Sequence, residues 1–191
     1  MRNIKLQERD QKIIEFLNEF KIAKVTTLQK LFFPSLRAAQ MRLIKLHQAK
    51  ILKRIRDPYS FEYMYFVNRK PVQIEHSLKI SDTIAEMSRI VDIAIMQSEY
   101  TIENIRADAL IGYIYKEKKY VAFLEVELSY NNLKKKIDKY EKLYASEKWK
   151  NYFPNFPKLI LVTNRKIEKS KNIESIKIKE NLSNINALVE S

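Results

Sequence analysis

Residues 35–68, SLRAAQMRLIKLHQAKILKRIRDPYSFEYMYFVN, contain the change from helix to strand that decides the fold of the N-terminal part of the chain. From Ser35 to Lys50 the apolar side chains return at helical spacing, and Ser35 is a residue type that commonly caps a helix N-terminus. Two β-rich runs follow, residues 51–56 and 61–68, and the turn-forming sequence Asp-Pro-Tyr-Ser at 57–60 joins them. The stretch therefore predicts one helix followed directly by a β-hairpin.

The predicted helix has an apolar side and a basic side when its residues are placed about 100° apart. We expect a buried stripe made of Leu36, Ala39, Leu43 and Leu46, with His47 packing at its margin. The residues on and beside the opposite side are candidates for contact with DNA: Arg37, Ala38, Met41, Arg42, Lys45 and Gln48. In a DNA major groove, Arg and Gln can pair with base edges, while Lys and Arg meet phosphates.

Two further helices are predicted upstream. Residues 7–20 carry apolar side chains at helical spacing, which indicates an amphipathic helix. A second helix begins at Thr26, where Thr26 and Gln29 match a capping box, and it stops before Pro34.

Three helices followed by a hairpin is the order of the winged form of the helix-turn-helix. Residues 1–70 are therefore predicted to be a winged-helix DNA-binding domain. Three cations of the predicted hairpin, Lys53, Arg54 and Arg56, would put positive charge on the wing.

The distribution of charge supports a polyanionic partner for this domain. Residues 1–70 contain 16 Lys and Arg against 6 Asp and Glu, whereas the other 121 residues contain 20 against 17. Solubility requires net charge but does not require that the charge be segregated. These cations could simply solvate a helix face, as most charge runs do. The agreement of charge, helix order and hairpin favours duplex DNA instead, and favours it over a membrane surface.

Composition excludes several classes of site. The chain has no Cys, so disulfides, thiolate nucleophiles and Cys-ligated zinc are ruled out, and its two His residues lie far apart in sequence. Its one glycine, Gly112, is too few for a phosphate-binding loop or a dinucleotide fingerprint. No apolar run approaches the length of a transmembrane helix and no signal-peptide core is present, so we expect a cytoplasmic protein with no membrane partner.

Residues 71–191 are predicted to form a second, α/β domain. A helix is expected over residues 74–97, either as a core helix or as a helix that mediates a homodimer. Extended segments follow at 100–105, 108–115 and 120–128, then a helix at 131–146 and an apolar strand at 158–163. A further strand is expected at 174–179. The chain is thus expected to be a two-domain α+β or α/β protein.

Three carboxylates in this second domain are candidates for catalysis. In VAFLEVEL, residues 121–128, Glu125 and Glu127 are two apart and leave the same face of the strand. Asp108 begins the neighbouring strand of the predicted hairpin. An Asp and a Glu on adjacent strands can converge to bind Mg²⁺, so Asp108 and Glu125 are candidate metal ligands. Such a metal could activate water for hydrolysis of a phosphate ester.

The order of elements, with Asp108 on one strand and Glu125 on the next, resembles the PD-(D/E)XK nuclease-like fold, αβββαβ. With the winged helix in front, the chain resembles the replication-relaxation family of bacterial plasmids and mobile elements. The resemblance covers nearly the whole chain and rests on six short segments: LFF at 31–33, YFV at 65–67, EH at 75–76, RADAL at 106–110, FLEVE at 123–127 and KIDKY at 136–140. It implies DNA binding in plasmid replication, relaxation or transfer.

Two departures from the motif bear on catalysis. Active nucleases of this fold have Lys two residues after the Glu, and this chain has Glu127 there; the motif has Pro before the Asp, and this chain has Ala107. The following helix could supply a lysine instead, from Lys134 or Lys135, which lie off its apolar stripe. Lys134 is therefore included as a catalytic candidate only for an active enzyme. We expect a domain that has kept the fold without the catalysis and requires no cofactor, with Mg²⁺ needed only by a nuclease.

Three functions remain open at this point. The first is a site-directed double-stranded DNA-binding protein of a plasmid or mobile element, acting in replication, relaxation or transfer or in their regulation. Its second domain would form a homodimer or dock a replication or transfer protein. The second is a Mg²⁺-dependent DNA nuclease targeted by the winged helix, and the third is a transcription repressor.

Overall fold

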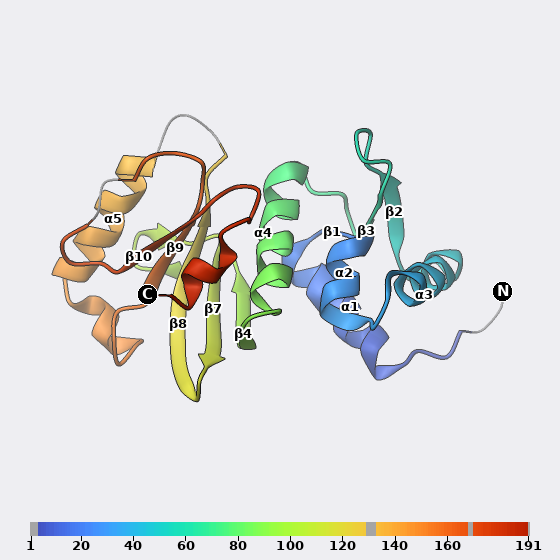
Figure 1. The fold of residues 1–191 in the computed structure, drawn as a ribbon, viewed down its shortest axis with the longest axis horizontal. Helices are drawn as coiled ribbons and strands as arrows, with labels where there is room; N and C mark the ends of the chain where they lie inside the picture. Colours follow the sequence, from blue (N-terminus) through green and yellow to red (C-terminus); the bar gives the residue numbers. More distant parts are fainter. Residues whose placement is uncertain (1–3, 129–132, 168–169, 191) are drawn as a thin grey trace. The chain divides into compact units, whose positions relative to one another are not determined.

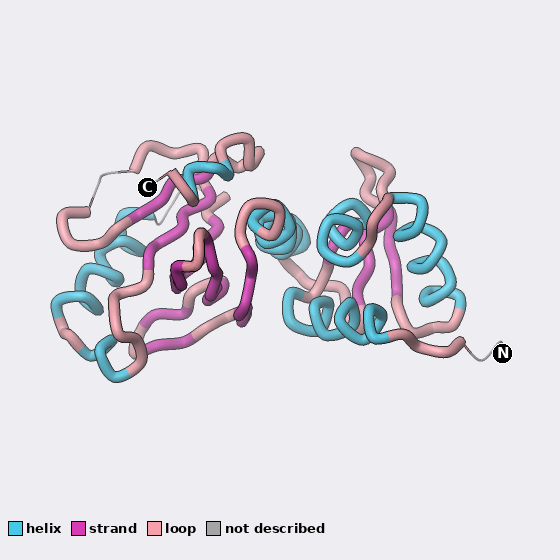
Figure 2. The backbone as a smooth tube through the Cα atoms, turned by 60° about the horizontal axis from the view of Figure 1, so that its bottom comes forward, coloured by secondary structure: helices cyan, strands magenta, loops and turns pink. Residues whose placement is uncertain are grey.

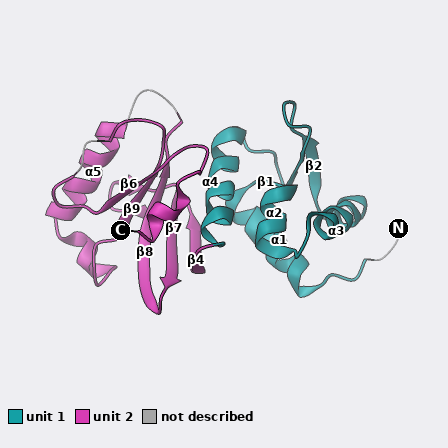
Figure 3. Ribbon diagram, viewed as in Figure 1, with its two compact units in different colours: residues 1–89 teal, residues 90–191 magenta. Residues whose placement is uncertain are grey.

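The computed structural model describes residues 4–128, 133–167 and 170–190 (Figure 1). The chain divides into two compact units, unit 1 at Met1–Arg89 and unit 2 at Ile90–Ser191 (Figure 3). Both contain helices and strands, so the expected mixed α/β composition is confirmed. No helix in the described ranges is both long enough and apolar enough to cross a membrane.

Unit 1 combines four helices with a small sheet. Its elements in chain order are α1 Glu8–Phe20, β1 Ala23–Lys24, α2 Val25–Phe32, α3 Leu36–Gln48, β2 Lys53–Arg56, β3 Tyr63–Phe66 and α4 Ile74–Met87. The sheet has the order β1-β3-β2 and is antiparallel throughout. The turn between β2 and β3 is held by Asp57, whose Oδ1 accepts the backbone N–H groups of Tyr59 and Ser60 at 2.8 and 3.0 Å.

Of the starts of α1, α2 and α3, two follow the prediction from the sequence. The side chain of Ser35 accepts the N–H of Ala38 at 3.3 Å, as predicted for the start of α3. Asp10 closes the start of α1 by accepting the N–H of Gln7 at 2.7 Å. The capping box predicted at Thr26 and Gln29 does not form. The Thr26 N–H is instead satisfied by Glu62 Oε1, at 2.7 Å, from a residue far along the chain.

Helix α4 belongs to unit 1, which places the division of the chain at residue 89 rather than at the predicted residue 70. Leu78 packs with Ile22, Met64 and Phe66 in one apolar cluster. Ser81 Oγ donates to the carbonyl of Ile22 at 2.7 Å.

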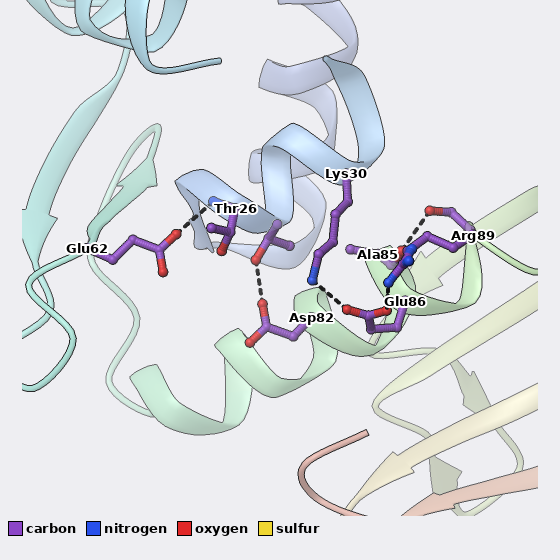
Figure 4. Close-up of polar contacts among 9 residues, drawn as sticks. Thr26, Lys30, Glu62, Asp82, Ala85, Glu86 and Arg89 are labelled. Atoms are coloured by element: carbon purple, nitrogen blue, oxygen red, sulfur yellow. Dashed lines mark hydrogen bonds and ion pairs between the residues drawn. The ribbon is translucent and has the colours of Figure 1, made fainter. Parts of the chain in front are cut away.

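Polar contacts also join α4 to α2 (Figure 4). Thr27 Oγ1 donates to Asp82, and Lys30 Nζ lies 2.5 Å from Glu86 Oε1. Glu86 also pairs with Arg89, at 3.0 Å. The Thr27–Asp82 and Lys30–Glu86 contacts each join residues more than fifty apart in sequence, so no local sequence pattern predicts them.

The predicted helix over residues 74–97 is too long. Helix α4 ends at Met87, and Asp92–Ser98 is strand β4, paired antiparallel with β7. The apolar positions of residues 92–96 are compatible with either period, and the hydrogen bonds to β7 decide for the strand. The register shifts between Ile93 and Ile95, opposite Gly112. A Cβ on Gly112 would lie 3.1 Å from the Cβ of Ile95, so the single glycine permits this close approach.

Unit 2 is built on a five-stranded sheet. Its remaining elements are β5 Thr101–Ile102, β6 Ile105–Arg106, β7 Ala109–Tyr115, β8 Lys118–Val126, α5 Leu133–Ala145, the 3₁₀ turn η1 Lys148–Asn151, β9 Lys158–Val162, β10 Ser175–Ile178 and the 3₁₀ turn η2 Ile185–Leu188. The strand order is β10-β9-β8-β7-β4, with β4, β7 and β8 antiparallel and β8, β9 and β10 parallel. The extended segment predicted at 100–105 is the small β5–β6 hairpin, a separate two-stranded sheet.

Helix α5 covers one face of this sheet (Figure 2). Its Leu133, Tyr140 and Leu143 are buried in a cluster with Phe123 and Leu161 from the strands. The helix was expected to begin at residue 131; residues 131 and 132 lie outside the described ranges. Side chains on one side of β7 and β8 therefore lie against α5.

Candidate functional site

The three predicted carboxylates come together beneath α5. Asp108 immediately precedes β7, Glu125 lies near the end of β8, and Glu127 follows that end. Ala109 pairs with Leu124 across the two strands, which brings Asp108 beside Glu125. Asp108 Oδ2 accepts the backbone N–H of Val126 at 2.7 Å and is thereby held in position.

A lysine from α5 completes the cluster, and it is Lys136. Its Nζ lies 2.6 Å from Glu125 Oε2 and 3.9 Å from both Asp108 Oδ2 and Glu127 Oε2. Lys134 and Lys135, the lysines expected from the sequence, are exposed. The structure therefore places a cation at the carboxylates, but from a position one or two residues further along the helix.

Sequence reasoning missed Lys136 although a signal was present. Lys136 lies four residues before Tyr140, so the two share a helix face. Tyr140 belongs to the buried side of α5 and is fully buried. A lysine one turn from a buried tyrosine was therefore the better candidate for the sheet-facing side.

Tyr140 fixes the central carboxylate from the other side. Its hydroxyl donates to Glu125 Oε1 at 2.6 Å, while Glu125 Oε2 contacts Lys136. Glu125 is only 1% exposed. Both of its oxygens thus face protein groups of fixed position rather than water.

Burial raises the pKa of Glu125 and of Tyr140 in this cluster, but it is outweighed at Lys136. It raises the pKa of Glu125 to about 7, against the attraction of the Lys136 ammonium and the Tyr140 hydrogen bond, and the charge of Asp108 adds to the rise. Burial also opposes the charged form of Lys136, but the carboxylates of Glu125 and Asp108 outweigh it and raise the pKa of Lys136. Burial, with the charge of Glu125, raises the pKa of Tyr140 far above its usual value, which keeps its hydroxyl a donor. Near neutral pH, Glu125 can exchange a proton while Lys136 remains charged.

The donor chemistry of the cluster fits a hard divalent cation such as Mg²⁺. Asp108, Glu125 and Glu127 direct oxygens towards one ammonium within 3.9 Å, and carboxylate oxygens are the ligands that Mg²⁺ prefers. Within the described ranges, no group of three or more His, Asp or Glu side chains is arranged so that it could hold a metal ion. A cation held by Asp108 and Glu125 would therefore share their oxygens with Lys136.

The second candidate region is the outer side of α3 in unit 1. Arg37, Met41, Lys45 and Gln48 are exposed, as predicted, and Ala38 is half-buried. The side chains of Arg37, Met41, Lys45 and Gln48 therefore face solvent from a helix whose opposite side is buried in the core.

The expected buried stripe of α3 is confirmed at Ala39, Leu43 and Leu46, all fully buried. Leu36, the fourth predicted member, is 41% exposed because it stands in the first turn, immediately after the cap. His47 packs as expected, with its Nδ1 3.1 Å from the carbonyl oxygen of Leu52.

Arg42 differs from the other cations of α3. Its Nε donates to Asp10 Oδ1 at 2.9 Å, and its Nη2 donates both to Asp10 Oδ2 and to the carbonyl of Lys5. Asp10 is fully buried, and the Arg42 and Gln7 hydrogen bonds hold its pKa below the usual value despite burial. The guanidinium of Arg42 thus anchors α3 to α1 instead of facing solvent.

The cations of the β2–β3 hairpin are steadied by contacts within the hairpin. Lys53 Nζ donates to the carbonyl of Asn68 at 2.7 Å, Arg54 lies 4.0 Å over the ring of Tyr63, and Arg56 Nε donates to the carbonyl of Phe61 at 2.9 Å. Lys53 and Arg56 remain exposed, and Arg54 is half-buried.

The tip of this hairpin carries two rings that the sequence reasoning did not single out. Tyr59 is 88% exposed and Phe61 is 64% exposed.

Comparison with known proteins adds no assignment to these sites: no family model, no curated protein and no solved structure matches the chain.

Proposed function

We propose that this chain is a site-directed double-stranded DNA-binding protein of a plasmid or mobile element. Unit 1 would act as a winged helix, with α3 as the recognition helix and the β2–β3 hairpin as the wing. The order helix, short strand, helix, helix, hairpin supports that assignment. The order β4, β7, β8, α5, β9 in unit 2, which α4 of unit 1 directly precedes in the chain, supports a PD-(D/E)XK-like second domain in the same proposal.

The observation that carries the proposal is the solvent-facing side of α3. Arg37 and Lys45 are exposed there beside Met41 and Gln48, on a helix that Arg42 anchors to the domain core. Such a side combines groups that contact phosphates with groups that contact base edges.

The test is a gel-shift titration of duplex DNA with the full chain and with two variants. Arg37→Ala and Lys45→Ala should each weaken binding by roughly 1–3 kcal/mol if they contact bases, or lower the salt slope by about 1 if they contact phosphates. Lys12→Ala is the matched control, because Lys12 is an exposed cation of α1 paired with Glu8. Equal weakening by all three variants would show that the effect comes from the net charge of the protein, and it would contradict the assignment of α3 as the recognition helix.

The process served is part of the proposal: replication, relaxation or transfer of the mobile element, or its regulation. A transcription repressor would use the same domain. Selection of bound fragments from plasmid DNA separates the two, since a repressor's site overlaps a promoter and the proposed protein's site lies at a replication or transfer origin.

A second candidate function, Mg²⁺-dependent cleavage of DNA, is favoured by one observation, the position of Lys136. The ammonium of Lys136 lies beside Glu125, Asp108 and Glu127, where it can offer a positive charge to a phosphate oxygen. In the usual motif a lysine two residues after the Glu supplies this charge, and this chain has Glu127 at that position. Tyr140 would keep Glu125 oriented. Mg²⁺, held by Asp108 and Glu125, would supply charge neutralisation at the phosphate and a more acidic water.

Supercoiled plasmid incubated with the protein in Mg²⁺ or Mn²⁺ tests this candidate. Lys136→Ala should lower the cleavage rate about a hundredfold or more, and Glu125→Ala should abolish cleavage. Lys134→Ala is the control, since it removes the same charge from an exposed position on the same helix. Plasmid left intact by the wild-type chain in both metals would exclude cleavage while leaving the DNA-binding proposal untouched.

A further inference from the structure

A cavity of about 110 Å³ lies in unit 2, away from the acidic cluster. Six of its lining residues carry polar groups: Tyr113, Tyr115, Lys116, Lys118, Tyr120 and Lys158. Tyr113 pairs with Tyr120 and Tyr115 with Lys118, so these four share one face of the β7–β8 hairpin. Glu125 is an odd number of residues from Tyr120 and leaves the opposite face. The cavity is therefore independent of the candidate active site.

The hydroxyl of Tyr113, which lines this cavity, is buried. Tyr113 is 2% exposed, and its Oη finds no donor or acceptor among the residues that the structure describes. Burial raises the pKa of Tyr113 to about 12, so the group is a neutral phenol that can donate. The ring cannot easily turn away, since it stacks on Tyr120 with centroids 5.2 Å apart and planes at 16°. Buried polar groups are rarely left unpaired, because that costs stability.

The charge around the cavity is positive. Lys158 Nζ lies 5.0 Å from the ring centroid of Tyr120 and pairs with Glu174, and Lys116 Nζ lies 5.2 Å from the ring centroid of Tyr115. Lys118 is exposed at the cavity edge. Three lysines thus line the cavity, and Glu174, the carboxylate beside Lys158, is paired with that lysine.

We propose that this cavity binds the phosphate group of a phosphate ester. A neutral hydroxyl donor and several ammonium groups together suit an oxyanion, and charge-assisted hydrogen bonds to its oxygens are the strong kind. The volume admits one such group and is well below the several hundred Å³ of a site for a whole cofactor. The group could be the end of a nucleic-acid strand or a small phosphate ester. The site does not depend on either function proposed above.

The first measurement is calorimetric titration of the full chain with inorganic phosphate at constant ionic strength. Saturable binding at one site is expected. Tyr113→Phe should weaken it about tenfold or more, because only the hydroxyl is lost. The same variant should melt at a higher temperature than the wild type in phosphate-free buffer, since an unpaired buried group has been removed.

A matched pair of lysine variants separates the cavity from general surface charge. Lys118 lines the cavity, whereas its neighbour Lys119 pairs with Ile114 and leaves the other face of β8. Lys118→Gln should weaken phosphate binding and Lys119→Gln should not. Absence of saturable binding, wild-type affinity in Tyr113→Phe, or equal weakening by both lysine variants would overturn the proposal.

Two oligonucleotides identify the source of the phosphate. A 5′-phosphorylated strand that displaces inorganic phosphate, where its 5′-hydroxyl counterpart does not, would assign the site to nucleic-acid ends. Phosphate binding that neither strand disturbs would assign it to a small phosphate ester.

Discussion

Arg37 and Arg42 show how one residue type on one helix acquires two roles. Arg37 is exposed on α3, while Arg42 is bound to the fully buried carboxylate of Asp10. Removing one partner of such a pair leaves a buried charge uncompensated, which is strongly destabilising. Substitution of Arg42 would therefore weaken any activity of the domain through its fold, whereas substitution of Arg37 tests contact directly.

Glu125 makes the stability of the folded chain depend on pH. Its pKa is about 7 in the folded chain against an ordinary 4.5, so the folded state holds the proton more tightly than the unfolded state does. The stabilising effect of that proton is fully present below pH 4.5 and is lost as pH rises to about 7. We expect the free energy of unfolding to fall by on the order of 1–3 kcal/mol across this window from Glu125.

Urea unfolding of Glu125→Gln between pH 4.5 and 8 measures this contribution. The variant should lack the fall that the wild type shows, because the amide does not titrate and still accepts the Tyr140 hydroxyl. Asp138→Asn, a change of the same kind at an exposed position of α5, should keep the wild-type slope. Identical slopes in the wild type and in Glu125→Gln would contradict the assigned pKa.

At the scale of elements, α4 completes unit 1. It covers Ile22, Met64 and Phe66 through Leu78 and bonds to α2 through Asp82 and Glu86 (Figure 4). Without α4, the apolar side chains of Ile22, directly before β1, and of Met64 and Phe66 in β3 would face water.

Two fragments test this role of α4. Residues 1–89 should give a cooperative thermal transition, whereas residues 1–70 should give a broad one or none, as followed by circular dichroism. Leu78→Ala in the longer fragment should cost about 2–4 kcal/mol, as for other buried Leu residues. A shorter fragment that melts as sharply as the longer one would show that α4 is not needed for the unit to fold.

At the scale of the whole molecule, positive charge is concentrated in unit 1. Residues 1–89 contain 18 Lys and Arg against 9 Asp and Glu, whereas residues 90–191 contain 18 against 14. Affinity for duplex DNA depends mainly on the number of phosphates neutralised. Unit 1 is therefore expected to account for most of the salt-dependent binding.

Binding of a duplex with 5′-hydroxyl ends at several salt concentrations checks this expectation. The fragment 1–89 should match the affinity and salt slope of the full chain within a few fold, and the fragment 90–191 should bind far more weakly. A loss of more than about tenfold in the fragment 1–89 would mean that unit 2 supplies phosphate contacts of its own.

Much of the local structure followed from the sequence. The helices α1, α3 and α5, the β2–β3 hairpin and the apolar strand β9 lie close to the predicted ranges. Each of these segments has one dominant period or a recognisable turn, and its hydrogen bonds are local or run to the next strand. The convergence of Asp108, Glu125 and Glu127 also followed, since the two Glu residues share a strand face and Asp108 was expected at the start of the neighbouring hairpin strand.

The tertiary structure alone decided which groups meet across long stretches of chain. Pairing with β7 made residues 92–98 a strand, Asp10 withdrew Arg42 from the surface, and the packing of α5 placed Lys136 at Glu125. The sequence by itself determined the periods, the turns and the charge of each segment, because these depend on neighbouring residues. The choice among equally periodic alternatives depended on partners many residues away, whose contact only the folded chain brings about.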